Sequence, residues 1–212
     1  MLSWSALVSA DEPKFASEAE ELLYYWGASF GEQVEAAGIE ADDEVAWIAR
    51  GLQDHAAGKA PAFGGEYRSL LNNFLVKRRN EMIGAERELA SEFLDDMAEE
   101  KGAIRLDSGI VYRELEAGAG ESPTTGSKIR VHYVGKLRDG VPFDSSRERG
   151  AAFETRLTQV IGCWKEAIPL MKPGGRALIG CPADKAYGDR GTPNIPPGAA
   201  LAFEVELLEI LD

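Results

Sequence analysis

The chain has few of the residues that build metal and thiol sites. Its 212 residues include two cysteines and two histidines, which are Cys163, Cys181, His55 and His132. These four residues lack the spacing of a zinc site, so we expect no bound metal. His132 falls on the polar side of a predicted strand and His55 falls in a loop, which argues against a catalytic triad or a histidine base. No glycine-rich loop joins a strand to a helix, so we expect no nucleotide cofactor.

Basic charge and long apolar runs are also scarce. The chain has 36 acidic and 23 basic residues, which gives a formal net charge of -13. Nucleic acids and anionic lipid surfaces both require a basic face, so neither is an expected partner. No segment is long and apolar enough to span a bilayer.

The first ten residues allow two interpretations. Residues 2–8 are mostly apolar, and Val8-Ser9-Ala10 is similar to a signal-peptidase site. The positively charged start of a signal peptide is missing, and the apolar run is short. Residues 1–10 are therefore either a signal-peptide remnant or a disordered N-terminus.

Apolar residues recur at helical spacing through residues 11–100. The pattern predicts a helical domain over 11–65, with a first helix at 14–37 and a second helix capped by Asp42. Residues 66–100 contain no proline and predict one connecting helix roughly 50 Å long. Two short helices cannot cover its apolar stripe, so we favour a dimer through these helices. The alternative is that the long helix lies across its own C-terminal domain.

The period changes from 3.6 to 2 after Lys101. Apolar residues alternate with polar ones from Ile129 to Leu137 and again from Leu201 to Leu207, which is typical of strands with one buried face. The segment from Trp164 to Met171 is the one short helical candidate between them. Residues 101–212 therefore predict an antiparallel sheet with one short helix, and the whole chain is α+β.

Four stretches of the C-terminal half resemble the FKBP family of peptidyl-prolyl cis–trans isomerases, in its order and spacing. They are VHYVGKLRDGVPFDSS (131–146), VIGCW (160–164), AYGDRG (186–191) and IPPGAALAFEVELLEI (195–210). Composition alone would have treated the aromatic residues in these stretches as core. Residues 24–54 and the long helix after them are similar to the dimerisation module of the bacterial macrophage infectivity potentiator subgroup.

The resemblance implies a half-barrel sheet wrapped around one short helix, with the isomerase pocket between them. The residues implied to act on the substrate are Tyr133, Phe143, Asp144, Ile161, Trp164, Tyr187 and Phe203. Three further residues are implied to bind substrate, namely Phe153, Val160 and Ile195. Trp164 would form the floor beneath the proline ring. Asp144 would lie at the rim, or would act as a structural carboxylate that holds loops together.

The resemblance also implies an enzyme that acts on proline-containing unfolded or peptide clients and is inhibited by macrolides. A V-shaped homodimer would add chaperone activity. The alternative is a chaperone or binding module with little isomerase activity. Such domains usually lose the pocket aromatics, and this chain keeps them, which favours the enzyme.

Three residues depart from the family pattern, namely Cys163, Cys181 and Thr155. In the family fold, the turn before the tryptophan helix and the end of the following strand lie close together, so the resemblance implies a possible disulfide between the two cysteines. Two buried free thiols remain the alternative. A disulfide would favour an oxidising compartment, and hence the bacterial periplasm or secretion over the cytoplasm.

Overall fold

The computed structural model describes residues 13–39, 41–62 and 64–211. The chain divides into two compact units, residues 1–79 (unit 1) and 80–212 (unit 2). The division falls inside the long helix, whereas the sequence placed the start of the isomerase domain at residue 101. Residues 1–10, the predicted signal remnant or free N-terminus, lie outside the described residues.

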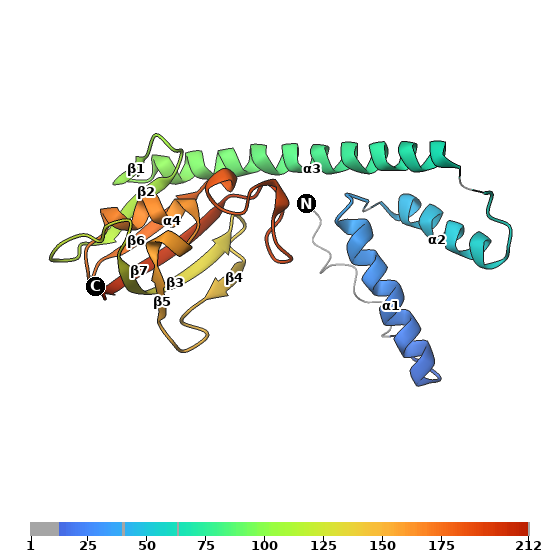
Figure 1. Cartoon of the computed structure of the whole chain (residues 1–212), viewed down its shortest axis with the longest axis horizontal. Helices are drawn as coiled ribbons and strands as arrows, with labels where there is room; N and C mark the ends of the chain where they lie inside the picture. The colour runs from blue at the N-terminus through green and yellow to red at the C-terminus, as the bar shows by residue number, and fades with distance from the viewer. Residues whose placement is uncertain (1–12, 40, 63, 212) are drawn as a thin grey trace. The chain divides into compact units, whose positions relative to one another are not determined.

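The longer helices come first in the chain, and the strands follow with the short helix α4 among them (Figure 1). The α-helices are α1 (Glu18–Glu35), α2 (Asp42–Ala56), α3 (Gly65–Glu99) and α4 (Gly162–Ala167). The strands are β1 (Ala103–Arg105), β2 (Val111–Glu116), β3 (Lys128–Leu137), β4 (Pro142–Ser145), β5 (Phe153–Arg156), β6 (Arg176–Cys181) and β7 (Leu201–Ile210). Short 3-10 turns connect them, namely η2 (Leu157–Gln159), η3 (Ile168–Leu170), η4 (Ala183–Lys185) and η5 (Gly188–Arg190).

The two helices of unit 1 begin differently from each other. α1 begins after Ser17, whose hydroxyl accepts a hydrogen bond from the backbone N–H of Glu20 at 3.3 Å. α2 follows Ala41, which offers no side-chain cap, so the prediction that Asp42 caps this helix was wrong. Asp42 instead lies in the first turn, where its negative charge favours the positive end of the helix dipole. Within the described residues, neither helix buries a single residue in this chain.

The long helix α3 runs from one unit into the other. Its C-terminal half packs on unit 2, where Ala90 and Leu94 are buried in a cluster with Val111 and Ala200. A Cβ atom built on Gly180 would lie 2.8 Å from Leu94 Cδ2, so a side chain at this position would displace the end of Leu94. The predicted alternative, a helix lying across its own C-terminal domain, therefore describes the second half of α3.

Unit 2 is built around one antiparallel sheet with the strand order β1-β2-β6-β7-β3-β4, and β5 pairs with β3. The central pair is β3 and β7, in which Tyr133 lies opposite Val205 and Gly135 lies opposite Phe203. Alternate residues of these strands are buried, as the period of two predicted.

The two faces of the sheet have different partners. One face packs with α4 in the main core, to which β2 contributes Tyr112 and β6 contributes Ile179. The neighbouring residues Val111 and Gly180 point to the opposite face and contact α3. The sheet is thus held between α4 and the second half of α3. Searching the described helices for a stretch long and apolar enough to cross a membrane finds none.

Candidate active site

Five aromatic side chains from five different elements form one cluster on the α4 face of the sheet. Tyr133 lies near the centre, with its ring centroid 5.1 Å from Trp164, 5.8 Å from Phe153 and 6.4 Å from Phe203. Phe203 also packs edge-to-face against Trp164 at 5.4 Å and against Phe143 at 5.6 Å. Offset and edge-to-face contacts of this kind stabilise aromatic pairs beyond their area burial. The structure therefore brings together aromatic residues that lie as far as 70 positions apart.

The backbone of β3 makes room for two of these rings. A Cβ atom built on Gly135 would lie 2.6 Å from Phe143 Cζ and 2.8 Å from Phe203 Cε1. Real Cβ atoms do not approach this closely, so the rings can occupy their positions only because residue 135 has no side chain. The sequence did not single out Gly135, because its role depends on the register that places it opposite Phe203.

Trp164 lies in the first turn of α4 and is almost fully buried, with 4% of its surface exposed. The preceding residue, Cys163, forms a disulfide with Cys181 at the end of β6, and the two Cα atoms are 5.6 Å apart. Both cysteines are completely buried. The short helix that carries Trp164 is therefore tied covalently to the sheet.

A polar network holds the hydroxyl group of Tyr133. The Tyr133 hydroxyl donates a hydrogen bond to Asp144, which also forms an ion pair with Arg149. The Arg149 Nη2 group donates to the Tyr133 hydroxyl at 2.9 Å, and the guanidinium lies 5.5 Å from the centre of the tyrosine ring. These contacts are those of a carboxylate that holds two other side chains in place. Arg149 was not predicted as a site residue, because its role is set by the turn after β4.

The same network affects proton binding at the site. Burial, followed by the hydrogen bond to Asp144, raises the pKa of the Tyr133 phenol. Burial and the nearby negative charge of Asp144 raise the pKa of Tyr187. Both phenols are therefore neutral at physiological pH and remain hydrogen-bond donors.

The remaining predicted site residues lie on segments that border the cluster. Ile195 is buried in the main core, and Val160 and Ile161 pack against that core. Tyr187 is 38% exposed and lies near enough to Asp144 for the charge of that carboxylate to raise its pKa. Ile161 is the N-cap residue of α4, and no backbone acceptor among the described residues takes a hydrogen bond from its N–H.

The polar side chains beside the cluster form hydrogen bonds with one another and with the backbone of β3. No group of three or more candidate metal-binding side chains occurs among the described residues. His132 Nδ1 lies 3.1 Å from the Ser146 hydroxyl, which in turn accepts the backbone N–H of Tyr133 at 2.8 Å. Ser146 and His132 thus support the backbone of β3 beside the cluster.

An apolar cluster with a few hydrogen-bond donors, on a half-barrel sheet around one short helix, defines an FKBP-type isomerase domain. The model of the FKBP-type peptidyl-prolyl cis–trans isomerase family matches residues 119–208, and the model of the domain amino-terminal to it matches residues 19–113. The chain belongs to this family and is a peptidyl-prolyl cis–trans isomerase that acts on proline-containing peptides.

The similarity to known members extends over nearly the whole chain. The FKBP-type 22 kDa peptidyl-prolyl cis–trans isomerase of Escherichia coli is 36% identical over 94% of this chain and 98% of the relative. The outer membrane protein MIP of Legionella longbeachae is 30% identical over 97% of this chain and 91% of the relative. The crystal structure of FkpA from Escherichia coli, at 31% identity, covers 93% of this chain and 98% of that one with a TM-score of 0.69.

Proposed function

We propose that the substrate proline binds against the cluster of Tyr133, Phe143, Phe153, Trp164 and Phe203. The observation that carries this proposal is the packing of Trp164 against both Tyr133 and Phe203 at the centre of the cluster. Trp164 is the floor beneath the proline ring. The remaining predicted residues, Val160 and Ile195, complete the apolar wall.

Prolyl rotation needs no acid, base or nucleophile, because no covalent bond breaks. The uncatalysed barrier of ~18–20 kcal/mol is set by amide resonance. A planar amide carries separated charge that water stabilises, whereas the twisted amide has lost most of it. An apolar surface therefore favours the twisted state over the planar one, which is differential binding of the transition state. Each ~1.4 kcal/mol gained in this way accelerates the reaction tenfold.

Two hydrogen-bond donors hold the substrate while the amide turns. The backbone N–H of Ile161 and the neutral hydroxyl of Tyr187 donate to carbonyl groups of the client or of a macrolide inhibitor. Asp144 and Arg149 hold the Tyr133 ring in position. Clients are bound through the ring and the backbone, so the site accepts many sequences around the proline.

Substituting Trp164 by alanine tests this pocket. We expect Trp164→Ala to lower kcat/KM on a prolyl peptide at least tenfold and to weaken macrolide binding, as measured by a protease-coupled assay and calorimetry. Tyr187→Phe removes one hydrogen bond, worth about 0.5–1.5 kcal/mol, so its effect is about two- to tenfold. Trp47→Ala is the matched control, since Trp47 is 77% exposed and lies in unit 1. Full activity in Trp164→Ala would refute the proposed pocket.

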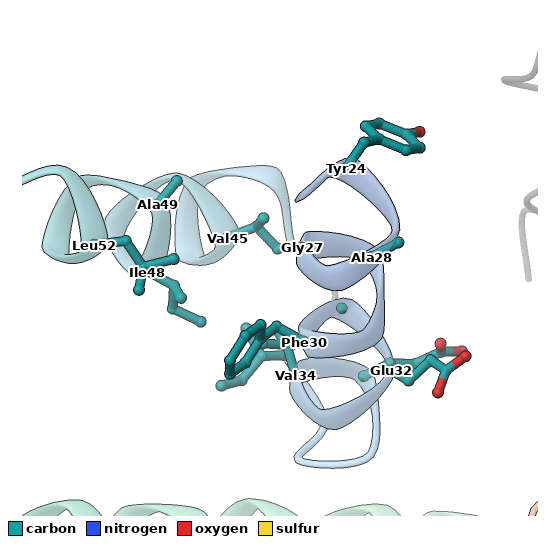
Figure 2. Close-up of a pocket in the computed structure, with 13 residues that line it drawn as sticks. Tyr24, Gly27, Ala28, Phe30, Glu32, Val34, Val45, Ile48, Ala49 and Leu52 are labelled. Carbon is teal, nitrogen blue, oxygen red and sulfur yellow. The ribbon is translucent and has the colours of Figure 1, made fainter. Parts of the chain in front are cut away.

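Unit 1 supports a second proposal, that the protein is a homodimer through its N-terminal helices. A groove between α1 and α2 is lined mostly by apolar side chains, together with Glu32 and Glu35, and Figure 2 shows Phe30 and Val34 directed toward the side where α2 lies. Neither helix buries a residue within the described chain, although both are rich in apolar side chains. A second copy of this chain offers the same apolar helices in return, as a two-fold interface requires.

A dimer would place two isomerase domains on one client, and this arrangement would add chaperone activity to catalysis. A fragment starting at Asn80 keeps the half of α3 that packs on the sheet. We expect the fragment to be monomeric by sedimentation, to retain activity on short peptides and to lose most activity in refolding a protein client. A full-length chain that sediments as a monomer at micromolar concentration would contradict the dimer. A full-length chain that binds clients but does not isomerise short peptides would favour the alternative, a binding module.

We also propose that the protein acts in an oxidising compartment, the bacterial periplasm or outside the cell. The Cys163–Cys181 disulfide supports this, because disulfides persist where thiol reductants are scarce. The relative from Legionella longbeachae is named an outer membrane protein. Cell fractionation with intact-mass analysis of the native protein would test this, and a cytoplasmic protein with two free thiols would overturn it.

A further inference from the structure

One turn of α3 contacts two loops that lead to the proposed pocket. Glu86 accepts two hydrogen bonds from Arg138 at 3.0 and 3.1 Å. Arg138 begins the turn from β3 to β4, and β4 carries Phe143 and Asp144. The next residue of the helix, Arg87, binds Asp189 through three contacts of 2.8 to 3.0 Å. Two consecutive residues of α3 therefore bind two different loops, namely the β3–β4 turn and the loop that contains Asp189.

Asp189 belongs to the loop that carries Tyr187. This loop closes on itself, because the Gly198 N–H donates to the Gly188 carbonyl at 3.0 Å. It also meets the helix at a second point, since a Cβ atom built on Gly198 would lie 3.1 Å from the Ile83 carbonyl oxygen and 3.3 Å from Arg87 Cγ. The loop from Tyr187 to Gly198 thus rests on α3 by both a charged contact and a backbone contact.

We propose that Arg87 is a positioning residue for prolyl isomerisation, which acts through Asp189 to hold Tyr187 in place and so couples the activity to the long helix. Glu86 has the same role for the β3–β4 turn. We call Ile83, Glu86 and Arg87 the α3 brace. The inference rests on the proposed pocket, because holding Tyr187 in place matters only if its hydroxyl donates a hydrogen bond to the substrate.

The expected effects follow from burial and geometry. The Arg87 and Asp189 side chains are 56% and 51% exposed, so water screens their attraction, although two nitrogens of one guanidinium bind one carboxylate. Glu86 and Arg138 are 17% and 23% exposed, so screening is weaker there. Loops belong to the least stable parts of a fold, and a small contact energy therefore changes how often this loop holds its active arrangement.

The test uses the full-length protein and short prolyl peptides. We expect Arg87→Ala and Asp189→Asn to lower kcat/KM about two- to fivefold and to speed amide hydrogen exchange across residues 187–198, with the Tm of unit 2 unchanged. Exchanging the charges, with Arg87→Asp and Asp189→Arg in one protein, should return both kcat/KM and the hydrogen-exchange rates most of the way to wild-type values. Arg105→Ala is the matched control, because Arg105 pairs at 2.6 Å with Asp95 of the same helix and contacts neither loop.

Four outcomes decide the proposal. Wild-type kcat/KM and exchange in Arg87→Ala, alongside an inactive Trp164→Ala, would overturn the brace and leave the pocket standing. Equal losses of kcat/KM in Arg87→Ala and Arg105→Ala would also overturn the brace, since the loss would then follow from removing any ion pair of α3. Full activity in Trp164→Ala would overturn the pocket itself, and the brace with it. Slower catalysis and faster exchange confined to the Arg87 and Asp189 variants would support the brace.

Discussion

The two units of this chain handle their apolar side chains in opposite ways. Unit 2 buries large residues completely, among them Ile129, Leu157 and Leu207. Unit 1 has comparable apolar content, yet Trp26 and Trp47 are 63% and 77% exposed. Burial of apolar surface contributes roughly 25 cal/mol for each Å² removed from water. This contribution stabilises unit 2 within one chain, whereas the exposed apolar side chains of unit 1 gain little of it.

This difference indicates which functions can be separated. Unit 2 has its own core, so its catalysis should depend only on the chain that carries it. Monomeric proteins seldom expose large apolar patches, and the apolar patches of unit 1 are where we propose that a second copy binds. The long helix α3 contributes to both units, and the part of it that belongs to unit 2 carries the α3 brace.

The largest effect should come from placing a charge in the groove of unit 1. Phe30 lines the groove between α1 and α2, and we expect Phe30→Glu to convert the proposed dimer into a monomer at micromolar concentration. Thermal unfolding of the wild type should show a first transition that rises with protein concentration and a second that does not. Phe30→Glu should abolish the concentration dependence and leave the second transition in place.

The matched control is Gln53→Ala, a change at an exposed residue of α2 that does not line the groove. It should leave the sedimenting mass unchanged. The free energy of unfolding in each transition should stay within about 0.5 kcal/mol of the wild-type value. If Phe30→Glu sediments like the wild type, the groove does not hold the second copy.

The next effect concerns the covalent tie in unit 2. Cys163 and Cys181 are separated by 18 positions, and closing a loop of this size stabilises a protein by about 3 kcal/mol in the chain-entropy model. We expect the variant with both residues changed to alanine to lose that amount in urea unfolding. Because both sulfurs are buried, native protein should resist reduction by a dithiol until it unfolds. Coincident unfolding curves would refute this contribution.

Much of the secondary structure could be predicted from local sequence patterns. The helix α3 was predicted within one residue at each end, because a long proline-free stretch with a helical period has few other interpretations. The start of α1 was placed four residues early, although Ser17 followed by Glu20 is a recognisable capping signal. β1 and β2 were not identified, since three and six residues with weak alternation give little signal.

The site residues that could be predicted are those that belong to the family motifs. They supply the aromatic residues, but not Gly135 or Arg149, whose roles arise from strand register and from a turn. The contacts of Arg87 with Asp189 join residues 102 positions apart and leave no trace in local sequence. Tertiary contacts of this kind follow from the fold and not from any periodicity.

A smaller effect should separate aromatic geometry from general packing in unit 2. Gly135→Ala would place a methyl group 2.6 Å from Phe143 Cζ, so the rings must move, at a cost of about 1–3 kcal/mol. We expect kcat/KM to fall more than stability does, because Phe143 and Phe203 lie in the proposed pocket. Gly126→Ala is the control, as the nearest neighbour of its added Cβ is 4.0 Å away. Equal activity in the two variants would contradict the role of Gly135.

The smallest effect tests where the boundary between the units lies. Gly84 is in the middle of α3, and a Cβ atom added there meets nothing within 4 Å, so Gly84→Ala should stabilise the helix by about 0.5–1 kcal/mol through backbone entropy alone. If residues 80–99 unfold with the sheet, the gain appears in the second, concentration-independent transition. A gain in the first transition would place this turn with unit 1 and would contradict its role as a brace for the pocket loops.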